Sequence, residues 1–179
     1  ERSSTRSPLA ELDLSRCAQL DAAALLSRIS SLFPGLAAVD MRGCRAGDAE
    51  ADAIALPASL RRVGLPSKLA RSVISGETDL VDLVLGDACP SMWRLEAGAQ
   101  RVGSRSFAAD AADAADADVI VASALRSGAL RHARTVVVTG ASPRCLPASE
   151  IAAMTSLTWL DLGPRGLALQ DLHALPAGR

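Results

Sequence analysis

The sequence contains no tyrosine, and aromatic residues make up only 2% of its 179 residues. A hydrophobic core must therefore be built from Leu, Val, Ile and Ala side chains. An excess of one charge is also missing, because 19 Lys and Arg residues balance 20 Asp and Glu residues. No global field therefore draws the chain to nucleic acid or to an anionic membrane, and we do not expect nucleic acid as the partner, although a local contact with either stays open. The longest candidate apolar run, at Val119, is far shorter than the roughly 20 residues of a membrane span.

Motifs for common metal and catalytic sites are absent as well. The cysteines at positions 17, 44, 89 and 145 form no CxxC pair and have no histidine in a zinc spacing. The sequence has no GxSxG, no HExxH and no GxxxxGK followed by Ser or Thr. His132 and His173 are too few for a catalytic triad. We expect no catalytic, cofactor-binding or metal site and no small-molecule substrate, and an enzyme is the third choice of function.

The composition is that of a globular chain, with 49% hydrophobic and 22% charged residues. Residues 1–8, ERSSTRSP, are expected to be a flexible leader, with the remnant of a targeting segment as the alternative. Residues 9–179 are expected to form a single domain.

One sequence skeleton occurs twice near the N-terminus, as LAELDLSRC from residue 9 and LAAVDMRGC from residue 36. Frames with apolar residues at positions 1, 4 and 6 begin at residues 9, 36, 60, 92, 133 and 157. A competing fourth frame begins at residue 80. We prefer residue 92, because a turn former precedes it by two residues, as it does at residue 36. The LVDLVL segment at 80–85 is then expected in an outer connection.

Helix-like stretches lie between these frames, at residues 18–33, 68–85, 117–133 and 147–155. In each of them Ala and Leu recur at spacings of three and four residues, which predicts an apolar helical stripe. The order of strand, turn, helix and return therefore repeats about six times.

The skeleton LxxLDLSxC resembles the leucine-rich repeat, and its cysteine-containing form resembles the repeats of F-box-type adaptors. The resemblance implies an α/β fold, a right-handed horseshoe solenoid with short parallel strands on the concave side and helices on the convex side. In such a solenoid Leu12, Val39, Val63 and Leu160 share one interior row.

Two cysteines occupy the same place in this skeleton, at the corner that follows the strand. Cys17 and Cys44 are expected to be buried free thiols whose S–H groups donate to backbone carbonyls. Free thiols indicate a reducing intracellular compartment, and the cytoplasm is preferred to the mitochondrion.

The segment SFAADAADAADAD, residues 106–118, lengthens the spacing between the fourth and fifth frames. Asp110, Asp113 and Asp116 would repel one another on a helical face, and the segment has no glycine for a calcium-binding turn. We expect a solvated acidic insertion, with a protein-contact insertion as the alternative.

Positions 3 and 5 of each frame are expected to face a partner on the concave sheet. Position 5 is mostly acidic and would suit a basic protein. The residues expected to bind a partner are Asp13, Asp40, Arg62, Arg94, Glu96, Trp159 and Asp161. For Trp159 the alternative is packing against Trp93 or the terminal helix.

These observations favour a non-enzymatic protein–protein interaction module that acts as an adaptor or scaffold. By its resemblance, such an adaptor would present substrates to a ubiquitin ligase, although no F-box is visible. The alternative is a permanent structural subunit of a large intracellular assembly, with an organellar assembly as one version.

Overall fold

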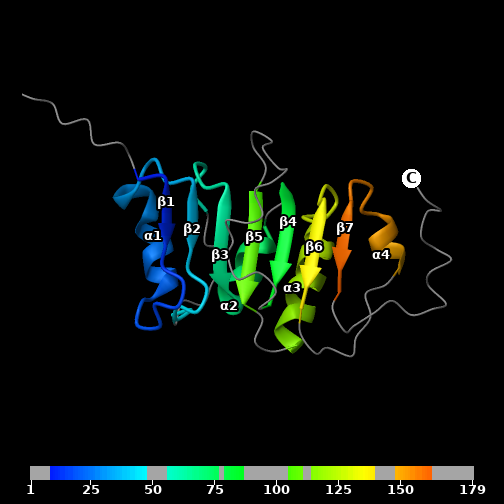
Figure 1. The fold of residues 1–179 in the computed structure, drawn as a ribbon, viewed down its shortest axis with the longest axis horizontal. Coiled ribbons are helices and arrows are strands. Elements are labelled where there is room, and N and C mark those ends of the chain that lie inside the picture. The colour runs from blue at the N-terminus through cyan, green and yellow to red at the C-terminus, as the bar shows by residue number, and fades with distance from the viewer. Residues whose placement is uncertain are drawn as a thin grey trace, which may run out of the picture.

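The computed structural model describes residues 9–47, 56–76, 79–86, 105–110, 114–139 and 148–162. They form an α/β fold in which seven parallel strands make one sheet and four helices pack against it (Figure 1). The strands are β1 (Glu11–Asp13), β2 (Ala38–Asp40), β3 (Arg62–Pro66), β4 (Leu80–Leu85), β5 (Arg105–Asp110), β6 (Thr135–Val138) and β7 (Trp159–Asp161). The helices are α1 (Ala22–Leu32), α2 (Ser67–Ile74), α3 (Ala114–Ser127) and α4 (Ala148–Ala152).

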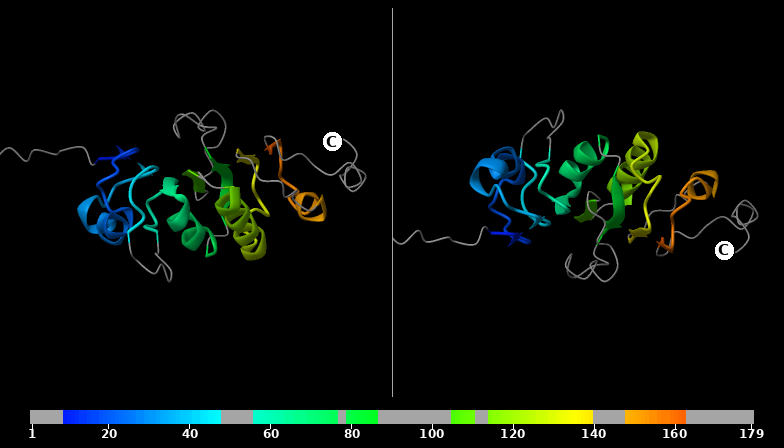
Figure 2. Two further views of the ribbon diagram at one scale, coloured as in Figure 1. Left: turned by 90° about the horizontal axis from the view of Figure 1, so that it is seen from below. Right: turned by 90° about the horizontal axis from the view of Figure 1, so that it is seen from above.

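The four helices lie on the same side of the sheet, as both views in Figure 2 show. We call the opposite side, on which none of the described helices lies, the open face. Side chains alternate along each strand, so every second residue points toward the helices. None of the helices in the described ranges is long and apolar enough to cross a membrane.

One interior row runs across the whole sheet, as expected from the repeated skeleton. The strand register aligns Leu12, Val39, Val63, Phe107, Leu83, Val136 and Leu160. The five central members are at most 1% exposed, and Leu12 and Leu160 pack against the core from the two ends. The interior side chains of neighbouring strands therefore cover one another and form a single continuous core.

Local signals set the ends of the longer helices. Asp21 is the N-cap of α1, and its Oδ1 accepts the N–H of Ala24 at 2.9 Å. Helix α3 ends at Gly128, which has a φ of +75°. The N–H groups of Gly128 and Ala129 there bond to the carbonyls of Leu125 and Ala124, the paired bonds of a Schellman motif.

The strand order is β1-β2-β3-β5-β4-β6-β7, so the middle of the sheet is not stacked in chain order. The expectation that 80–85 forms an outer connection is wrong, because this segment is the buried strand β4. LVDLVL is apolar except for Asp82, whose Oδ2 accepts a bond from Ser106 Oγ of β5 at 3.1 Å, so the segment can fill a central position. The preferred fourth frame at Met92 lies outside the described residues.

The expectation of an acidic insertion at 106–118 is also wrong for the residues that the structure describes. Residues 105–110 form β5, which pairs with β3 on one side and β4 on the other. Phe107 supplies the interior side chain, and the small Ala108 and Ala109 are 1% exposed. Asp116 lies in the first turn of α3, where a carboxylate interacts favourably with the helix dipole.

The two repeated cysteines differ in exposure. Cys44 is buried, as expected, and its Sγ donates to the Leu14 carbonyl at 3.2 Å. Cys17 is exposed, so the expectation of two buried thiols is wrong at this position. Cys17 belongs to the first strand unit, and nothing described in the chain precedes that unit and covers it.

Candidate functional site

The open face carries two rows of side chains, set by the strand register. The row at position 5 contains Asp13, Asp40, Gly64, Ala108, Val84, Val137 and Asp161. The row at position 3 contains Glu11, Ala38, Arg62, Ser106, Asp82, Thr135 and Trp159. Acidic residues therefore occupy the two ends of the position 5 row, and small or apolar residues occupy its centre.

The acidic end near β1 and β2 differs from the solvent-facing ladder expected from the sequence. Asp40 is only 2% exposed, so the expectation that it faces solvent is wrong. Its carboxylate is paired with the guanidinium of Arg42, with Nη2 and Oδ2 2.7 Å apart, and Nε contacts both oxygens. A charge buried this deeply needs such a partner, and Arg42 supplies it from two residues along the chain. Asp13, in the next strand, is exposed and accepts the Ser15 N–H at 2.9 Å.

Arg62 lies near the same end of the open face and is held within the molecule. Its Nη2 contacts Glu11 Oε1 at 2.6 Å across the intervening strand β2. Ala38 lies between the two residues in the register, and its small side chain leaves room for the pair. The ion pair fixes the orientation of Arg62, and Glu11 remains 56% exposed in its side chain.

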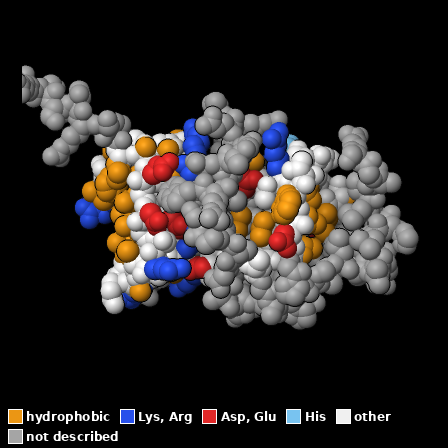
Figure 3. All heavy atoms as spheres, viewed as in Figure 1, with side chains coloured by type: hydrophobic (Ala, Val, Ile, Leu, Met, Phe, Trp, Pro, Cys, Tyr) orange, Lys and Arg blue, Asp and Glu red, His pale blue; other side chains and the backbone are white. Residues whose placement is uncertain are grey.

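Trp159 stands at the opposite end of the open face, on β7. It is 62% exposed, the highest value among the large hydrophobic side chains of the described residues. Thr135 is its neighbour in the register, and the exposed Asp161 follows it on the same face. Figure 3, viewed in the same direction as Figure 1, shows hydrophobic side chains at the β6–β7 end and a mixture of hydrophobic and charged side chains at the β1–β3 end.

Two further residues expected to bind a partner, Arg94 and Glu96, lie outside the described residues. So does Trp93, the packing partner considered for Trp159. The structure therefore brings Asp13, Asp40 and Arg62 together near one end of the sheet, and it places Trp159 and Asp161 at the other end.

Asp110, at the carboxyl end of β5, has a linking role that the sequence did not reveal. Its Oδ2 accepts the Gly43 N–H at 2.8 Å, and its Oδ1 accepts the Ser67 N–H at 3.1 Å. One carboxylate thus joins the turn after β2, the start of α2 and the end of β5. In the sequence, Asp110 is the first Asp of the Ala- and Asp-rich segment that we assigned to an acidic insertion.

Burial raises the pKa of Asp110, while the N–H groups of Gly43 and Ser67 lower it by a smaller amount. The folded chain therefore keeps this proton to a higher pH than the unfolded chain does. Stability from this group is present at low pH and falls as the pH rises through the folded pKa.

A second polar group lies beside this link. Asp116 in α3 accepts a bond from Ser67 Oγ at 3.0 Å and pairs with Arg71 of α2. Two carboxylates and one arginine here connect α2, α3 and β5. Each described contact is made within the molecule, which indicates that this group holds the helices on the sheet.

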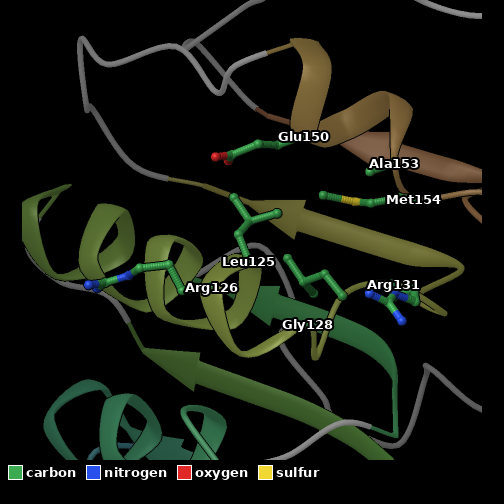
Figure 4. Close-up of a pocket in the computed structure, with 8 residues that line it drawn as sticks. Leu125, Arg126, Gly128, Arg131, Glu150, Ala153 and Met154 are labelled. Carbon is green, nitrogen blue, oxygen red and sulfur yellow. The ribbon is translucent and has the colours of Figure 1, made fainter.

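A small pocket opens on the helical side, between α3, the turn after it and α4 (Figure 4). Its volume is about 200 Å³, below the roughly 300 Å³ at which small-molecule pockets commonly begin. Leu125 and Met154 point toward one another across it, while Arg126 points away. The pocket has room for a few apolar atoms and holds no convergent set of polar groups.

The search for metal-binding clusters of His, Cys, Asp and Glu found none among the described residues. Comparison of the chain with known protein families, with curated proteins and with solved structures found no match. The function must therefore be inferred from the geometry of this chain.

Proposed function

We propose that this chain is a non-enzymatic protein-binding module whose partner contacts the open face of the sheet at the β6–β7 end. The observation that carries the proposal is the exposure of Trp159. Leaving 62% of a tryptophan in water is costly, and exposed tryptophans are enriched among the residues that anchor protein interfaces.

The surroundings of Trp159 define the partner's chemistry. Thr135 and Val137 of β6 are half-buried beside it, and Asp161 is an exposed carboxylate two residues away. A protein segment with an apolar side chain for the indole and a neighbouring Lys or Arg would complement this surface. The opposite end of the open face, where Arg62 is paired with Glu11, would contribute little to such a contact.

We further propose that the fold derives from the leucine-rich repeat. Strands β4 and β5 add frames at residues 80 and 104 to the repeated skeleton, so frames begin at 9, 36, 60, 80, 104, 133 and 157. Successive frames are then 27, 24, 20, 24, 29 and 24 residues apart. These spacings lie within the range of roughly 20–29 residues that this repeat family shows.

Two observations bear on this second proposal in different ways. The shared interior row and the helices on one side support it. The exchange of β4 and β5 is a departure from the sequential stacking of a simple solenoid. The proposal therefore describes a repeat array with one altered step at its centre.

A photo-crosslinking amino acid at position 159 tests the binding surface. The same group at position 32 is the control, because Leu32 is 48% exposed on α1, on the helical side of the sheet. We expect one protein to be crosslinked from position 159 and not from position 32. Equal capture from both positions would argue for nonspecific contact.

The captured protein is then purified and its affinity measured against Trp159→Ala and Leu32→Ala chains. Loss of an anchoring tryptophan costs about 2 kcal/mol or more, which is on the order of thirtyfold in Kd. The Leu32→Ala chain should bind within about twofold of the original, since its site is not involved. Unchanged affinity of the Trp159→Ala chain would refute the proposal.

A further inference from the structure

Two matching turns place Cys17 and Cys44 next to each other. The Cys17 N–H bonds to the Leu14 carbonyl at 3.1 Å, and the Cys44 N–H bonds to the Met41 carbonyl at the same distance. The residue before each cysteine has a positive φ, +67° at Arg16 and +78° at Gly43. The chain therefore makes the same β-turn after β1 and after β2.

The two turns are stacked directly on each other. The Arg16 N–H donates to the Arg42 carbonyl at 2.7 Å. A Cβ atom built on Gly43 would lie 3.1 Å from the Arg16 Cα, so the two Cα atoms are within about 5 Å. Disulfides join residues whose Cα atoms are about 4.4–6.8 Å apart, and the cysteines follow these two residues directly.

The Cys44 thiol and the Cys17 backbone N–H also share one acceptor. The Leu14 carbonyl receives the Cys44 Sγ at 3.2 Å and the Cys17 N–H at 3.1 Å. The Cys44 sulfur thus lies over the turn that Cys17 ends. Burial, and after it the neighbouring Cys17 thiol, raise the pKa of Cys44, as expected for two thiols in close proximity.

The two cysteines differ in solvent exposure, and a redox pair requires such a difference. Cys17 is exposed and can meet an oxidant in solution, whereas Cys44 is buried and can meet only its neighbour. From this geometry we propose that Cys17 and Cys44 are a modification site that forms a reversible disulfide under peroxide.

The chemistry balances with hydrogen peroxide as the oxidant. The Cys17 sulfur attacks one peroxide oxygen, the O–O bond breaks, and a sulfenic acid and one water molecule result. The Cys44 sulfur then attacks the Cys17 sulfur, and the hydroxyl group leaves as a second water with the Cys44 proton. The S–S bond closes a loop across one repeat and ties the turn after β1 to the turn after β2.

The test uses the chain with Cys89→Ser and Cys145→Ser, so that only the two thiols at issue remain. After treatment with a small excess of hydrogen peroxide, intact mass should fall by two hydrogen atoms. Proteolysis without reductant should release one crosslinked peptide pair containing Cys17 and Cys44. Dithiothreitol should restore both thiols.

Two single variants in the same background make the result specific. Cys17→Ser should leave Cys44 unmodified, because the buried thiol is shielded from the oxidant. Cys44→Ser keeps a hydroxyl donor for the Leu14 carbonyl, and Cys17 should then remain as a sulfenic acid that dimedone traps. The proposal is overturned if the original pair gives trapped Cys17 with Cys44 free, or disulfides only between separate molecules.

Discussion

Replacing Gly86 by Ala should destabilise the chain much more than replacing Gly128 by Ala. Both glycines have a positive φ, +89° and +75°, which an L side chain rarely adopts. They differ in the space around them. A Cβ at Gly86 would lie 2.3 Å from Thr139 Oγ1 and 2.4 Å from the Thr139 carbonyl oxygen, whereas a Cβ at Gly128 meets nothing within 4 Å.

The expected losses follow from this difference. The left-handed backbone conformation costs an alanine about 1–2 kcal/mol at either position. At Gly86 the added methyl group must also push the end of β4 away from Thr139, and such overpacking costs about a further 1–3 kcal/mol. Two bonds hold the strands here, from Gly86 N–H to the Ala109 carbonyl at 2.7 Å and from Thr139 N–H to the Leu85 carbonyl at 2.9 Å.

Urea unfolding followed by far-ultraviolet circular dichroism measures both variants against the original chain. We expect Gly86→Ala to lose roughly 2–5 kcal/mol of unfolding free energy and Gly128→Ala roughly 1–2 kcal/mol. Equal losses would refute the close approach of β4 to β6 at their carboxyl ends. A smaller loss in Gly86→Ala than in Gly128→Ala would contradict the position of β4 between β5 and β6.

Four further changes test other parts of the structure by the same unfolding measurement. Phe107→Ala should cost about 3–5 kcal/mol, because it empties the centre of the interior row, and a loss under about 1 kcal/mol would restore the view of 106–118 as a surface insertion. Asp40→Ala should cost about 3 kcal/mol because it removes a buried carboxylate and the ion pair that it makes with Arg42. Glu11→Ala should cost under about 1 kcal/mol because that ion pair is solvent-exposed, and equal losses at Asp40 and Glu11 would contradict their different burial. Asp110→Asn should flatten the decrease in stability that accompanies rising pH through the raised pKa of Asp110, and an unchanged pH profile would assign that decrease to other groups.

The sequence predicted the layout of the sheet wherever the skeleton is complete. Leu12, Val39 and Val63 occupy the interior row, and the Cys44 thiol donates to a backbone carbonyl at the corner. These features depend on residues close together in the chain, and a short periodic pattern records such local geometry directly.

The centre of the sheet could not be predicted in the same way. The β5 frame begins with Ser104 in place of an apolar residue, and its Ala108 and Ala109 give little hydrophobic signal. LVDLVL gives a strong signal, but a short apolar run fits a buried helix as well as a buried strand. Which strand lies beside which is decided by contacts between residues distant in sequence, and a single sequence does not display these contacts.

Solvent exposure on the open face could be predicted only in part, because it also depends on what covers each side chain. Alternation correctly placed Asp40 and Trp159 on the same side of the sheet, but it carries no information about what covers that side. Trp159 is open to solvent and Asp40 is not. The arginine two residues after Asp40 is the nearest available signal that this carboxylate is internally paired.

The position of β5 between β3 and β4 has a consequence for synthesis on the ribosome. A plain repeat array can add each unit to the previous one as it emerges. In this chain β3 has no neighbour on one side until residues 105–110 arrive, because β4 emerges earlier but belongs one place further along. Until then β3 has unpaired backbone N–H and C=O groups along one edge, and a chaperone that covers this edge would protect the nascent chain from pairing with other chains.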